Sequence, residues 1–451
     1  MRVLFRTFGC KANQYDTERM RQELEALGAS AVVDAPKADV CIVNTCTVTN
    51  QADADARRFV RRVRRKNPDV SVVVAGCSSA LDPDTYRAMD GVVAVVEGHD
   101  PVEVARAALL DGNGAGPHPS RTSGAGAHLV QLESRLRLDA MDGEPVGGEL
   151  LRRRRGGTRG WLKIQDGCDR KCSFCATRLA RGPSRSRPPG ELVREAGLLA
   201  GNHPELVLTG IHIGHYGRDL EETSTLAHVL ERLLEEVPRV RFRVGSIEAT
   251  EVEDRLLALI QESGGRLAPH LHMPMQSGSD PVLRRMRRWH TREMYRRRAL
   301  EIAERIPGLG LGADIITGFP GEDEGDHAGT RSLVEELPFT YLHVFPYSPR
   351  DGTPAVDLPD PVPQRIAGER SRELRELGLE KGERYRESRS GQRAEVVLEG
   401  SSGWALTEDY LRVRVREPGV ENLGGQPGLV PGRLVGPGEH LAIDLSRRSL
   451  N

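Results

Sequence analysis

Hydrophobic and polar positions follow two different periods along the first part of the chain. Four short runs rich in β-branched residues have the composition of buried strands: residues 2–5, 39–44, 70–75 and 92–96. Between them, residues 17–28 and 52–65 place apolar side chains three and four positions apart, which predicts amphipathic helices. Strands that alternate with helices predict a parallel sheet with crossover helices. We therefore expect a parallel α/β domain over residues 1–112.

Further strand candidates follow a stretch rich in Gly, Ser and Pro. They lie at residues 161–165, 205–210, 240–246, 270–276, 311–318 and 341–347. The segments between them, such as 225–237, have the spacing of amphipathic helices. Consecutive βα units of this kind fit a curved, incompletely closed barrel better than a doubly wound sheet. We expect a partial (β/α)6 barrel over residues 154–384, preceded by a linker at 113–153.

The last part of the chain, residues 386–451, changes pattern again. Short runs that suit strands stand between Gly- and Pro-rich turns, at residues 393–400, 410–417 and 440–446. Such an arrangement is typical of a small antiparallel β-barrel. The predicted fold class is thus a multidomain α/β chain with a parallel α/β domain, a partial barrel and a small β-barrel.

Charge and hydropathy narrow the setting of the protein. Its 64 basic residues are balanced by 65 acidic ones, so no overall field attracts nucleic acid or a membrane. The first residues, MRVLFRTFGC, lack the basic and apolar regions of a signal peptide. No uncharged apolar run approaches the roughly 20 residues that cross a bilayer. We expect a soluble, cytoplasmic protein with no membrane partner, in a reducing compartment that keeps thiols free.

Three of the seven cysteines stand within one short segment, at Cys168, Cys172 and Cys175. A structural zinc site normally has four ligands, and a disulfide framework needs an even number of cysteines. The segment follows the first strand of the predicted barrel, so it lies at the face where barrel active sites are built. Three thiolates leave one iron of a cubane iron–sulfur cluster open to a small molecule. This pattern favours a catalytic metal centre over a structural zinc site.

Three other cysteines, Cys10, Cys46 and Cys77, each stand at the carboxyl end of a predicted strand. In an open parallel sheet, ligands bind in the crevice beyond these strand ends. The three thiols can therefore converge, although three unrelated strand-end thiols are an equal alternative from the residues alone. Cys41 lies within a strand among apolar neighbours, and we interpret it as a buried hydrophobic residue.

Motifs along nearly the whole chain resemble the tRNA methylthiotransferases of the radical S-adenosylmethionine (SAM) superfamily. They are, in order, TFGCKANQYDTERM, NTCTVTNQAD, AGC, GCDRKCSFC, LTGIHIGHYG, HLHMPMQSGSDPVLRRMRR, ADIITGFPGE and PYSPRDGTPA. The resemblance implies an N-terminal domain with an auxiliary 4Fe–4S cluster, a radical SAM barrel with a second 4Fe–4S cluster, and a C-terminal RNA-binding TRAM barrel. The implied ligands of the auxiliary cluster are Cys10, Cys46 and Cys77. The implied ligands of the radical SAM cluster are Cys168, Cys172 and Cys175.

The resemblance also implies a reaction. One SAM molecule methylates sulfur held at the auxiliary cluster, and a second yields a 5′-deoxyadenosyl radical that removes hydrogen from C2 of an adenosine. The C2–H bond offers no acidic proton to a side-chain base, so the cofactors carry the reaction and no side chain is assigned as a catalytic group. The implied partners are tRNA, an electron donor and a sulfur donor.

Further candidate contacts lie in the barrel and in the basic runs. The residues expected to bind SAM are Gly210, Ser246, Glu248 and Gln276. Basic runs at 57–66, 152–155 and 284–298 are candidates for contacts with RNA phosphates. The candidates for stacking on or gripping RNA bases in the last domain are Trp404, Tyr410, Arg412 and Arg414. The alternatives are ordinary polar strand ends, solvated helix faces and core packing.

The expected substrate is an adenosine on the 3′ side of the anticodon that carries an N6-threonylcarbamoyl or N6-isopentenyl group. The first group needs cationic and hydrogen-bonding partners, whereas the second needs an apolar pocket. Polar residues near predicted strand ends favour the first: they are His212, His215, Tyr216, Tyr347 and Arg350. The surrounding motifs also resemble the threonylcarbamoyladenosine branch of the family. The alternatives are an isopentenyladenosine enzyme, a ribosomal-protein methylthiotransferase and a non-catalytic iron–sulfur RNA-binding redox regulator.

Overall fold

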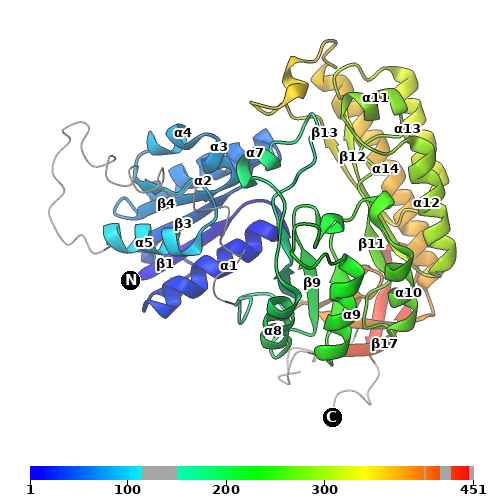
Figure 1. Cartoon of the computed structure of the whole chain (residues 1–451), viewed down its shortest axis with the longest axis horizontal. Coiled ribbons are helices and arrows are strands. Elements are labelled where there is room, and N and C mark those ends of the chain that lie inside the picture. The colour runs from blue at the N-terminus through cyan, green and yellow to red at the C-terminus, as the bar shows by residue number, and fades with distance from the viewer. Residues whose placement is uncertain (113–149, 401–402, 417–427, 446–451) are drawn as a thin grey trace.

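The computed structural model describes residues 1–112, 150–400, 403–416 and 428–445 (Figure 1). Its first part is a sheet of parallel strands in the order β2-β1-β3-β4-β5. The strands are β1 (Arg2–Thr7), β2 (Ser30–Val32), β3 (Val40–Thr45), β4 (Ser71–Gly76) and β5 (Val92–Val95). The helices are α1 (Lys11–Ala26), α2 (Asn50–Lys66), α3 (Cys77–Leu81), α4 (Pro83–Arg87) and α5 (Pro101–Gly112). The predicted parallel α/β fold is confirmed.

Strand β3 shows how this sheet is covered on both faces, because each of its residues is buried. Val40 and Ile42 pack in a core with residues of α1 and α5. Cys41 and Val43 point to the other face and pack with residues of α2 and α4. Cys41 is completely buried, as the sequence predicted. The edge strand β2 is short and largely exposed, and no hydrophobic run in the sequence predicted it.

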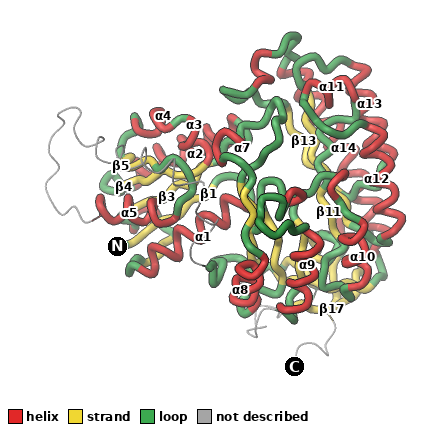
Figure 2. Tube along the Cα trace, viewed as in Figure 1, coloured by secondary structure: helices red, strands yellow, loops and turns green. Residues whose placement is uncertain are grey.

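The second part is a curved array of parallel strands, drawn in yellow in Figure 2 with helices on its outer side. One sheet has the order β10-β9-β6 and the other the order β11-β12-β13. The strands are β6 (Gly160–Lys163), β9 (Glu205–Thr209), β10 (Arg241–Val244), β11 (His270–His272), β12 (Gly310–Thr317) and β13 (Tyr341–Pro346). Isolated parallel bridges, Phe242 to Leu267 and Ser246 to His272, join the two sheets. In the described residues no strand pairing connects β6 with β13, so the predicted partial barrel is confirmed.

Helices and short strands complete this barrel. The larger helices are α8 (Pro189–Ala200), α9 (Leu226–Glu236), α10 (Asp254–Glu262), α12 (Arg292–Arg305), α13 (Glu324–Glu336) and α14 (Gln364–Arg389). The shorter elements are β7 (Gln165–Asp166), α7 (Thr177–Arg181), β8 (Arg185–Ser186) and α11 (Asp280–Arg285). Tyr15 of α1 is part of the barrel's apolar core, so the first helix of the chain packs against the open side of the barrel next to β6.

The third part is a closed barrel of short strands in the order β14-β15-β16-β18-β17. They are β14 (Arg393–Leu398), β15 (Trp404–Thr407), β16 (Arg412–Val415), β17 (Leu429–Val435) and β18 (Ala442–Leu445). The prediction of a small β-barrel is confirmed, but the prediction that it is antiparallel throughout is wrong. Strands β16 and β18 pair in parallel. Strand β17 comes between them in the sequence and pairs antiparallel with the other edge of β18, so β18 runs in the same direction as β16.

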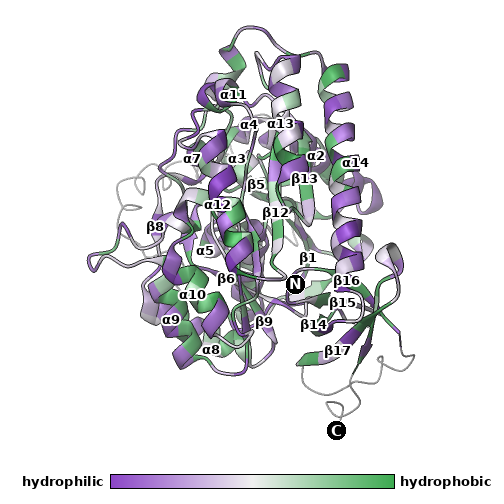
Figure 3. Cartoon of the chain, turned by 90° about the vertical axis from the view of Figure 1, so that its right-hand side faces the viewer, coloured by the Kyte–Doolittle hydropathy of each residue, from purple (hydrophilic) through white to green (hydrophobic). Residues whose placement is uncertain are grey.

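The small barrel docks on the partial barrel through buried charges. Arg241 and Arg243 on β10 are completely buried, and both pair with Glu205 on β9. Arg241 Nη1 also donates to the Glu395 carbonyl at 2.8 Å, and Arg243 Nη1 donates to the Glu408 carbonyl at 2.9 Å. Figure 3 shows α14 running along the strands toward this small barrel. The two barrels therefore share polar groups that are satisfied only while they stay together.

The predicted domain limits stay predictions. Most of the expected linker, 113–153, lies outside the described residues, and its described end contacts α1 through Gln22, which bonds the backbone of Leu150 and Arg152. Helix α14 continues past the expected limit at 384, and β14 begins at Arg393. Of the helices that the structure describes, none combines the length and the apolarity needed to span a membrane.

Candidate iron–sulfur and SAM site

The first group of thiols lies on the loop between β7 and α7. Gly167 begins the loop with a φ of 68°, and a Cβ at this position would lie 1.8 Å from the Pro183 carbonyl oxygen. Only glycine fits there. The Cys168 N–H donates to the Gly182 carbonyl at 3.1 Å, and the Cys168 sulfur accepts from the Arg170 N–H at 3.4 Å. The loop is therefore pinned at both ends and holds its first thiol in a fixed position.

The three thiols of this loop lie close enough to affect one another. Burial raises the pKa of the Cys168 thiol to about 12, and the Cys175 and Cys172 sulfurs add to the rise. Burial also raises the pKa of Cys172, while Arg288 lowers it. Arg288 Nη1 donates to the Cys172 sulfur at 3.5 Å. Because iron binds the thiolate and not the thiol, a buried guanidinium beside the sulfur favours the form that a metal requires.

Two predicted SAM contacts lie beside this loop. Glu248 is paired with Arg288, and its side chain is 11% exposed. Burial raises the pKa of Glu248, and Arg288 opposes the rise. Gly210 ends β9, where a Cβ would lie 2.8 Å from the Gln165 carbonyl. Glu248 is thus engaged with an arginine that reaches a cysteine, and Gly210 allows close backbone packing.

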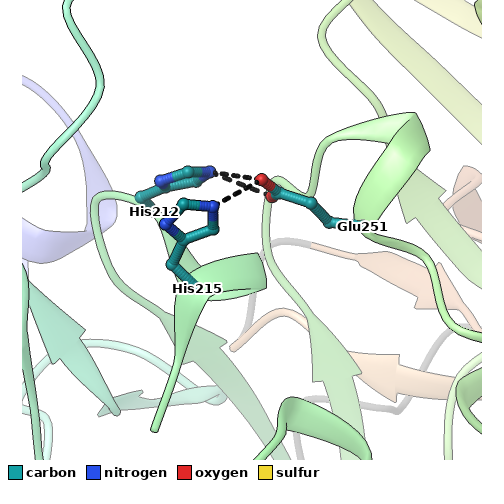
Figure 4. A group of neighbouring side chains, drawn as sticks. All are labelled: His212, His215 and Glu251. Carbon is teal, nitrogen blue, oxygen red and sulfur yellow. Dashed lines mark hydrogen bonds and ion pairs between the residues drawn. The ribbon is translucent and has the colours of Figure 1, made fainter. Parts of the chain in front are cut away.

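His212 and His215, which the sequence placed near the substrate, meet at Glu251 (Figure 4). His212 Nε2 lies 2.9 Å and His215 Nε2 lies 3.1 Å from a Glu251 oxygen. Arg170 of the cysteine loop also donates to Glu251 at 2.9 Å. His212 Nδ1 lies 3.8 Å from the Cys168 sulfur. These contacts join the cysteine loop to the 3-10 turn at Ile213–His215.

The remaining residues predicted to recognise the substrate pack inside the protein, and among them the Tyr347 hydroxyl has no hydrogen-bond partner in the described part of the chain. Tyr216 is buried, and its hydroxyl donates to the Arg187 carbonyl at 2.7 Å. Tyr347 packs edge-on against Phe319, with ring centroids 5.1 Å apart. Arg350 has its partners beside the second group of thiols. The predicted polar set is therefore not gathered at one surface.

The second group of thiols converges at the carboxyl ends of β1, β3 and β4. The Cys10 and Cys77 sulfurs lie 3.9 Å and 3.7 Å from the same atom, Asn13 Oδ1. A Cβ on Gly9 would lie 2.5 Å from the Cys46 sulfur, so Cys46 packs directly against the residue before Cys10. Burial raises the pKa of Cys46 to about 11 and that of Cys77 to about 12, and nearby sulfurs contribute to both rises. The three strand-end thiols therefore lie near one another.

Arg350 connects the barrel to this second group. It follows β13, and its guanidinium pairs with Asp53 and donates to Asn50 Oδ1 at 2.5 Å. It also donates to the Thr47 hydroxyl, one residue after Cys46. Its side chain is 8% exposed. Arg350 is thus placed to hold the two domains together, and not to meet a ligand in solvent.

A buried charge network that the sequence did not reveal lies between the two groups of thiols. Arg181, on α7, donates to the Cys77 sulfur at 3.3 Å and to Asp16 Oδ2 at 2.8 Å. It also donates to both oxygens of Asp166, at 2.8 and 3.0 Å. Lys163 Nζ completes the network, 2.5 Å from Asp16 and 3.0 Å from Asp166. A motif search could not find it, because its members come from both domains.

A second unforeseen cluster lies on three neighbouring strands of the barrel, β11, β12 and β13. His272 Nε2 is 3.0 Å and His343 Nδ1 is 3.3 Å from Asp314 Oδ1. His343 is half exposed and Asp314 is 29% exposed, so the cluster is open on one side. Two predicted SAM contacts flank it, because Ser246 forms a bridge with His272 and the Gln276 N–H donates to the Asp314 carbonyl at 2.8 Å. Alternation of polar residues in three separate strands was its only sequence signal.

The predicted RNA contacts have mixed environments. The guanidinium groups of Arg412 and Arg414 lie over the Trp404 ring, 4.5 and 4.0 Å from its centroid, and both arginines are exposed. Tyr410 instead stacks on His270 of the partial barrel, with centroids 4.4 Å apart. Of the basic runs, 57–66 presents several exposed arginines on α2, whereas 284–298 includes the buried Arg288. In the run 152–155, the guanidinium of Arg154 lies over the Trp161 ring.

Two family models match the chain over its first two parts. The model of the uncharacterized protein family UPF0004 matches residues 2–98, and that of the radical SAM superfamily matches residues 162–334. Among solved structures, the radical S-adenosylmethionine methyltransferase TsrM from Kitasatospora setae, with cobalamin and a [4Fe-4S] cluster bound, is similar with a TM-score of 0.54 and 16% identity. The match covers 79% of this chain and 74% of that one. The fold and the three-cysteine loop define a radical SAM enzyme.

Curated relatives narrow the family. The chain is 34% identical to the threonylcarbamoyladenosine tRNA methylthiotransferase MtaB of Rickettsia prowazekii, over 91% of this chain and 90% of that protein. It is 36% identical to the enzyme of the same name from Bacillus subtilis, over 88% and 84%. The tRNA-2-methylthio-N(6)-dimethylallyladenosine synthase of Bacillus subtilis is 32% identical over 88% of this chain and 76% of that protein. The chain belongs to the tRNA methylthiotransferase family.

Membership of this family implies 4Fe–4S chemistry and SAM, and the thiols present fit the clusters. Each group offers three thiols, the donor that iron–sulfur clusters use. Each group also has N–H donors aimed at sulfur. Arg170 and Arg288, which lies after α11, donate to the first group, and Val48 and Arg181 donate to the second. Such donors stabilise thiolates and tune a cluster.

Proposed function

We propose that this enzyme adds a methylthio group to C2 of N6-threonylcarbamoyladenosine next to the anticodon of tRNA. The observation that carries the proposal is similarity along the whole length. Relatives named for the threonylcarbamoyl substrate are 33–36% identical and are covered over 84–96% of their length. Those named for dimethylallyladenosine are 31–32% identical and are covered over 75–76%.

The chemistry of the barrel interior supports the same substrate. A threonylcarbamoyl group carries a carboxylate, a hydroxyl and a urea, which need polar partners. The half-exposed His343 on β13 and the partly exposed Asp314 on β12 offer such partners. The polar residues expected from the sequence support it less, since His212, His215 and Arg350 have partners within the protein.

The proposal assigns separate roles to the two groups of thiols. Cys168, Cys172 and Cys175 hold a cluster with one open iron for SAM, which supplies radical chemistry when bound. The thiols of the other group, at the ends of β1, β3 and β4, hold the auxiliary cluster. Glu251 and Arg170 orient the first loop, and Arg288 stabilises the charge of the Cys172 thiolate.

Nucleoside mass spectrometry tests the substrate. The gene is expressed in a host that lacks both tRNA methylthiotransferases, and the digested tRNA is analysed. The proposal expects a methylthio gain on threonylcarbamoyladenosine alone, reduced in His343→Ala and Asp314→Asn variants that keep wild-type iron. The control Glu336→Gln changes an exposed carboxylate on α13 and should leave the yield unchanged. A gain on isopentenyladenosine alone would assign the other substrate.

Iron analysis tests the cluster assignment. Two cubanes require about eight irons per chain after anaerobic reconstitution. Replacing Cys168, Cys172 and Cys175 by Ala should remove about half of the iron and all reductive SAM cleavage. Replacing the three cysteines of the other group should remove the other half, keep SAM cleavage and abolish methylthio product. Full iron content in either triple variant would refute the assignment.

A further inference from the structure

Arg181 connects the two groups of thiols. It lies on α7, the short helix that follows the Cys168–Cys175 loop, and its side chain is 1% exposed. Its Nε donates at 3.3 Å to the Cys77 sulfur, which belongs to the other domain. One buried arginine thus follows the first cysteine loop and bonds a cysteine of the other group.

The two other nitrogens of this guanidinium, Nη1 and Nη2, also have hydrogen-bond partners. Nη1 donates to Asp166, and Nη2 donates to Asn13 Oδ1 at 2.6 Å and to Asp16 at 2.8 Å. Asn13 is fixed in turn, because its Nδ2 donates to the Phe8 and Thr45 carbonyls at 2.9 and 2.7 Å. The planar fork of an arginine can satisfy partners in three directions, which an ammonium group cannot.

The charge of Arg181 is maintained in this buried position. An arginine stays protonated in proteins, and here guanidinium nitrogens of Arg181 lie 2.8 Å from carboxylate oxygens of Asp16 and Asp166. Removing a buried cation from a network with two carboxylates leaves them under-compensated, so the position cannot be neutral without cost. The N–H that reaches Cys77 is therefore a charge-assisted donor.

We propose that Arg181 is a positioning and potential-tuning residue for the auxiliary cluster, acting through its N–H donation to Cys77. This inference rests on the proposed function, which assigns a cluster to Cys10, Cys46 and Cys77. A reduced cluster carries one more negative charge than an oxidised one. A charged N–H donor at a ligand sulfur stabilises the reduced form more, which raises the reduction potential.

The carboxylate contact extends the role of Arg181 to the other loop. Asp166 stands two residues before Cys168, and its Oδ1 accepts from the Gly167 N–H at 2.8 Å. Arg181 therefore fixes the start of the radical SAM loop and a ligand of the auxiliary group with one rigid side chain. Arg181 thus links the positions of the two groups of thiols.

The test measures the midpoint potential of the auxiliary cluster alone. The full chain carries Cys168→Ala, Cys172→Ala and Cys175→Ala, is reconstituted anaerobically, and is titrated while the reduced cluster is followed by electron paramagnetic resonance. Arg181→Met in this background should shift the midpoint to a more negative value. Arg178→Met, on the exposed face of the same helix, is the matched control and should leave it unchanged.

A second variant separates tuning from folding. Arg181→Lys keeps a cation between Asp16 and Asp166 but cannot also reach the Cys77 sulfur. It should bind wild-type iron, keep the wild-type circular dichroism spectrum and still show a more negative midpoint. An unchanged midpoint in this variant would overturn the inference and leave the proposed function intact. A background protein that binds no iron at all would overturn both, and it is recognised before Arg181 is changed.

Discussion

The surroundings of each cysteine decide what it can do. Cys41 and Cys46 are five residues apart around the same strand, and both are buried. Cys41 has only apolar neighbours, and burial raises its pKa to about 12 with no opposing donor. Cys46 instead accepts a hydrogen bond from the Val48 N–H at 3.4 Å and packs against Gly9. Burial alone therefore does not distinguish Cys41 from Cys46, whereas the N–H donor at the Cys46 sulfur does.

Cys41→Ser should separate these two kinds of thiol. A hydroxyl without a partner in this apolar core should cost about 1–3 kcal/mol in the free energy of unfolding. The iron content after reconstitution should stay at the wild-type value. Iron analysis and denaturant unfolding check both statements. Cys46→Ser is the contrasting variant and should lower iron content; equal iron loss in the two variants would contradict the distinction.

His290 should make stability depend on pH. It is 4% exposed, and burial lowers its pKa to about 4 while Arg288 adds to the effect. Between this value and the ordinary histidine pKa of about 6.5, the unfolded chain binds a proton that the folded chain does not. Stability should therefore be full above about pH 6.5 and fall as the pH drops toward 4, by at most about 1.4 kcal/mol per unit.

Denaturant unfolding of the wild type and of His290→Gln, measured across this pH range, isolates that contribution. The difference in unfolding free energy between the two proteins should change with pH in the direction just given. His228, at the exposed surface of α9, supplies the control substitution His228→Gln. A wild-type slope that persists in His290→Gln would show that other groups cause the dependence.

At the scale of elements, the sequence predicts what is local. The parallel strands of the partial barrel are apolar runs with helical segments between them, and all six were found. Strands β2, β8, β15 and β17 were missed because they are short or, as in β17, interrupted by Pro431 and Gly432. The parallel pairing of β16 with β18 could not be predicted, since pairing depends on tertiary contacts and not on the strand's own residues.

The candidate site shows the same limit. Convergence of Cys10, Cys46 and Cys77 followed from strand ends, because parallel strands end at one edge of a sheet. The partners of these thiols did not, because Arg181 and Asp166 belong to the other domain. Sequence patterns also could not show that Arg350 bonds α2, since its partners lie about 300 residues away.

The link between β13 and α2 yields a prediction. Arg350→Ala leaves Asp53 in a mostly buried place without its cation, which should cost about 3–5 kcal/mol in stability. A double-mutant cycle with Asp53→Ala should give a coupling energy above about 1 kcal/mol, because the two groups touch. Thermal or denaturant unfolding of the reconstituted protein measures it. Arg218→Ala, near the barrel mouth, is a control; additive effects in the Arg350 cycle would contradict the link.

At the scale of the whole molecule, buried arginines connect the three parts. Arg181 links the first domain to the partial barrel, and Arg241 and Arg243 link the partial barrel to the small one. Removing the small barrel would expose Arg241, Arg243 and Glu205 to solvent and strip several of their hydrogen bonds. A truncation after residue 385 would also cut α14 before its end at Arg389. Loss of RNA binding in such a truncation would therefore not locate the RNA surface.

Point substitutions on the exposed face of the small barrel locate it better. Arg414 lies over the Trp404 ring and is exposed on β16, where a guanidinium can contact phosphate while the ring offers a face for a base. Arg414→Ala should weaken tRNA binding and reduce the slope of log affinity against log salt by about one unit. Trp404→Ala should weaken binding with little change in that slope, because stacking involves no phosphate charge. Filter binding or fluorescence anisotropy over a range of salt concentrations measures both.

Arg255→Ala is the control, since the charge of Arg255 is already paired with Glu231 on α9 and Glu262 on α10. Unchanged affinity and slope in both variants would show that the small barrel does not hold tRNA through this face.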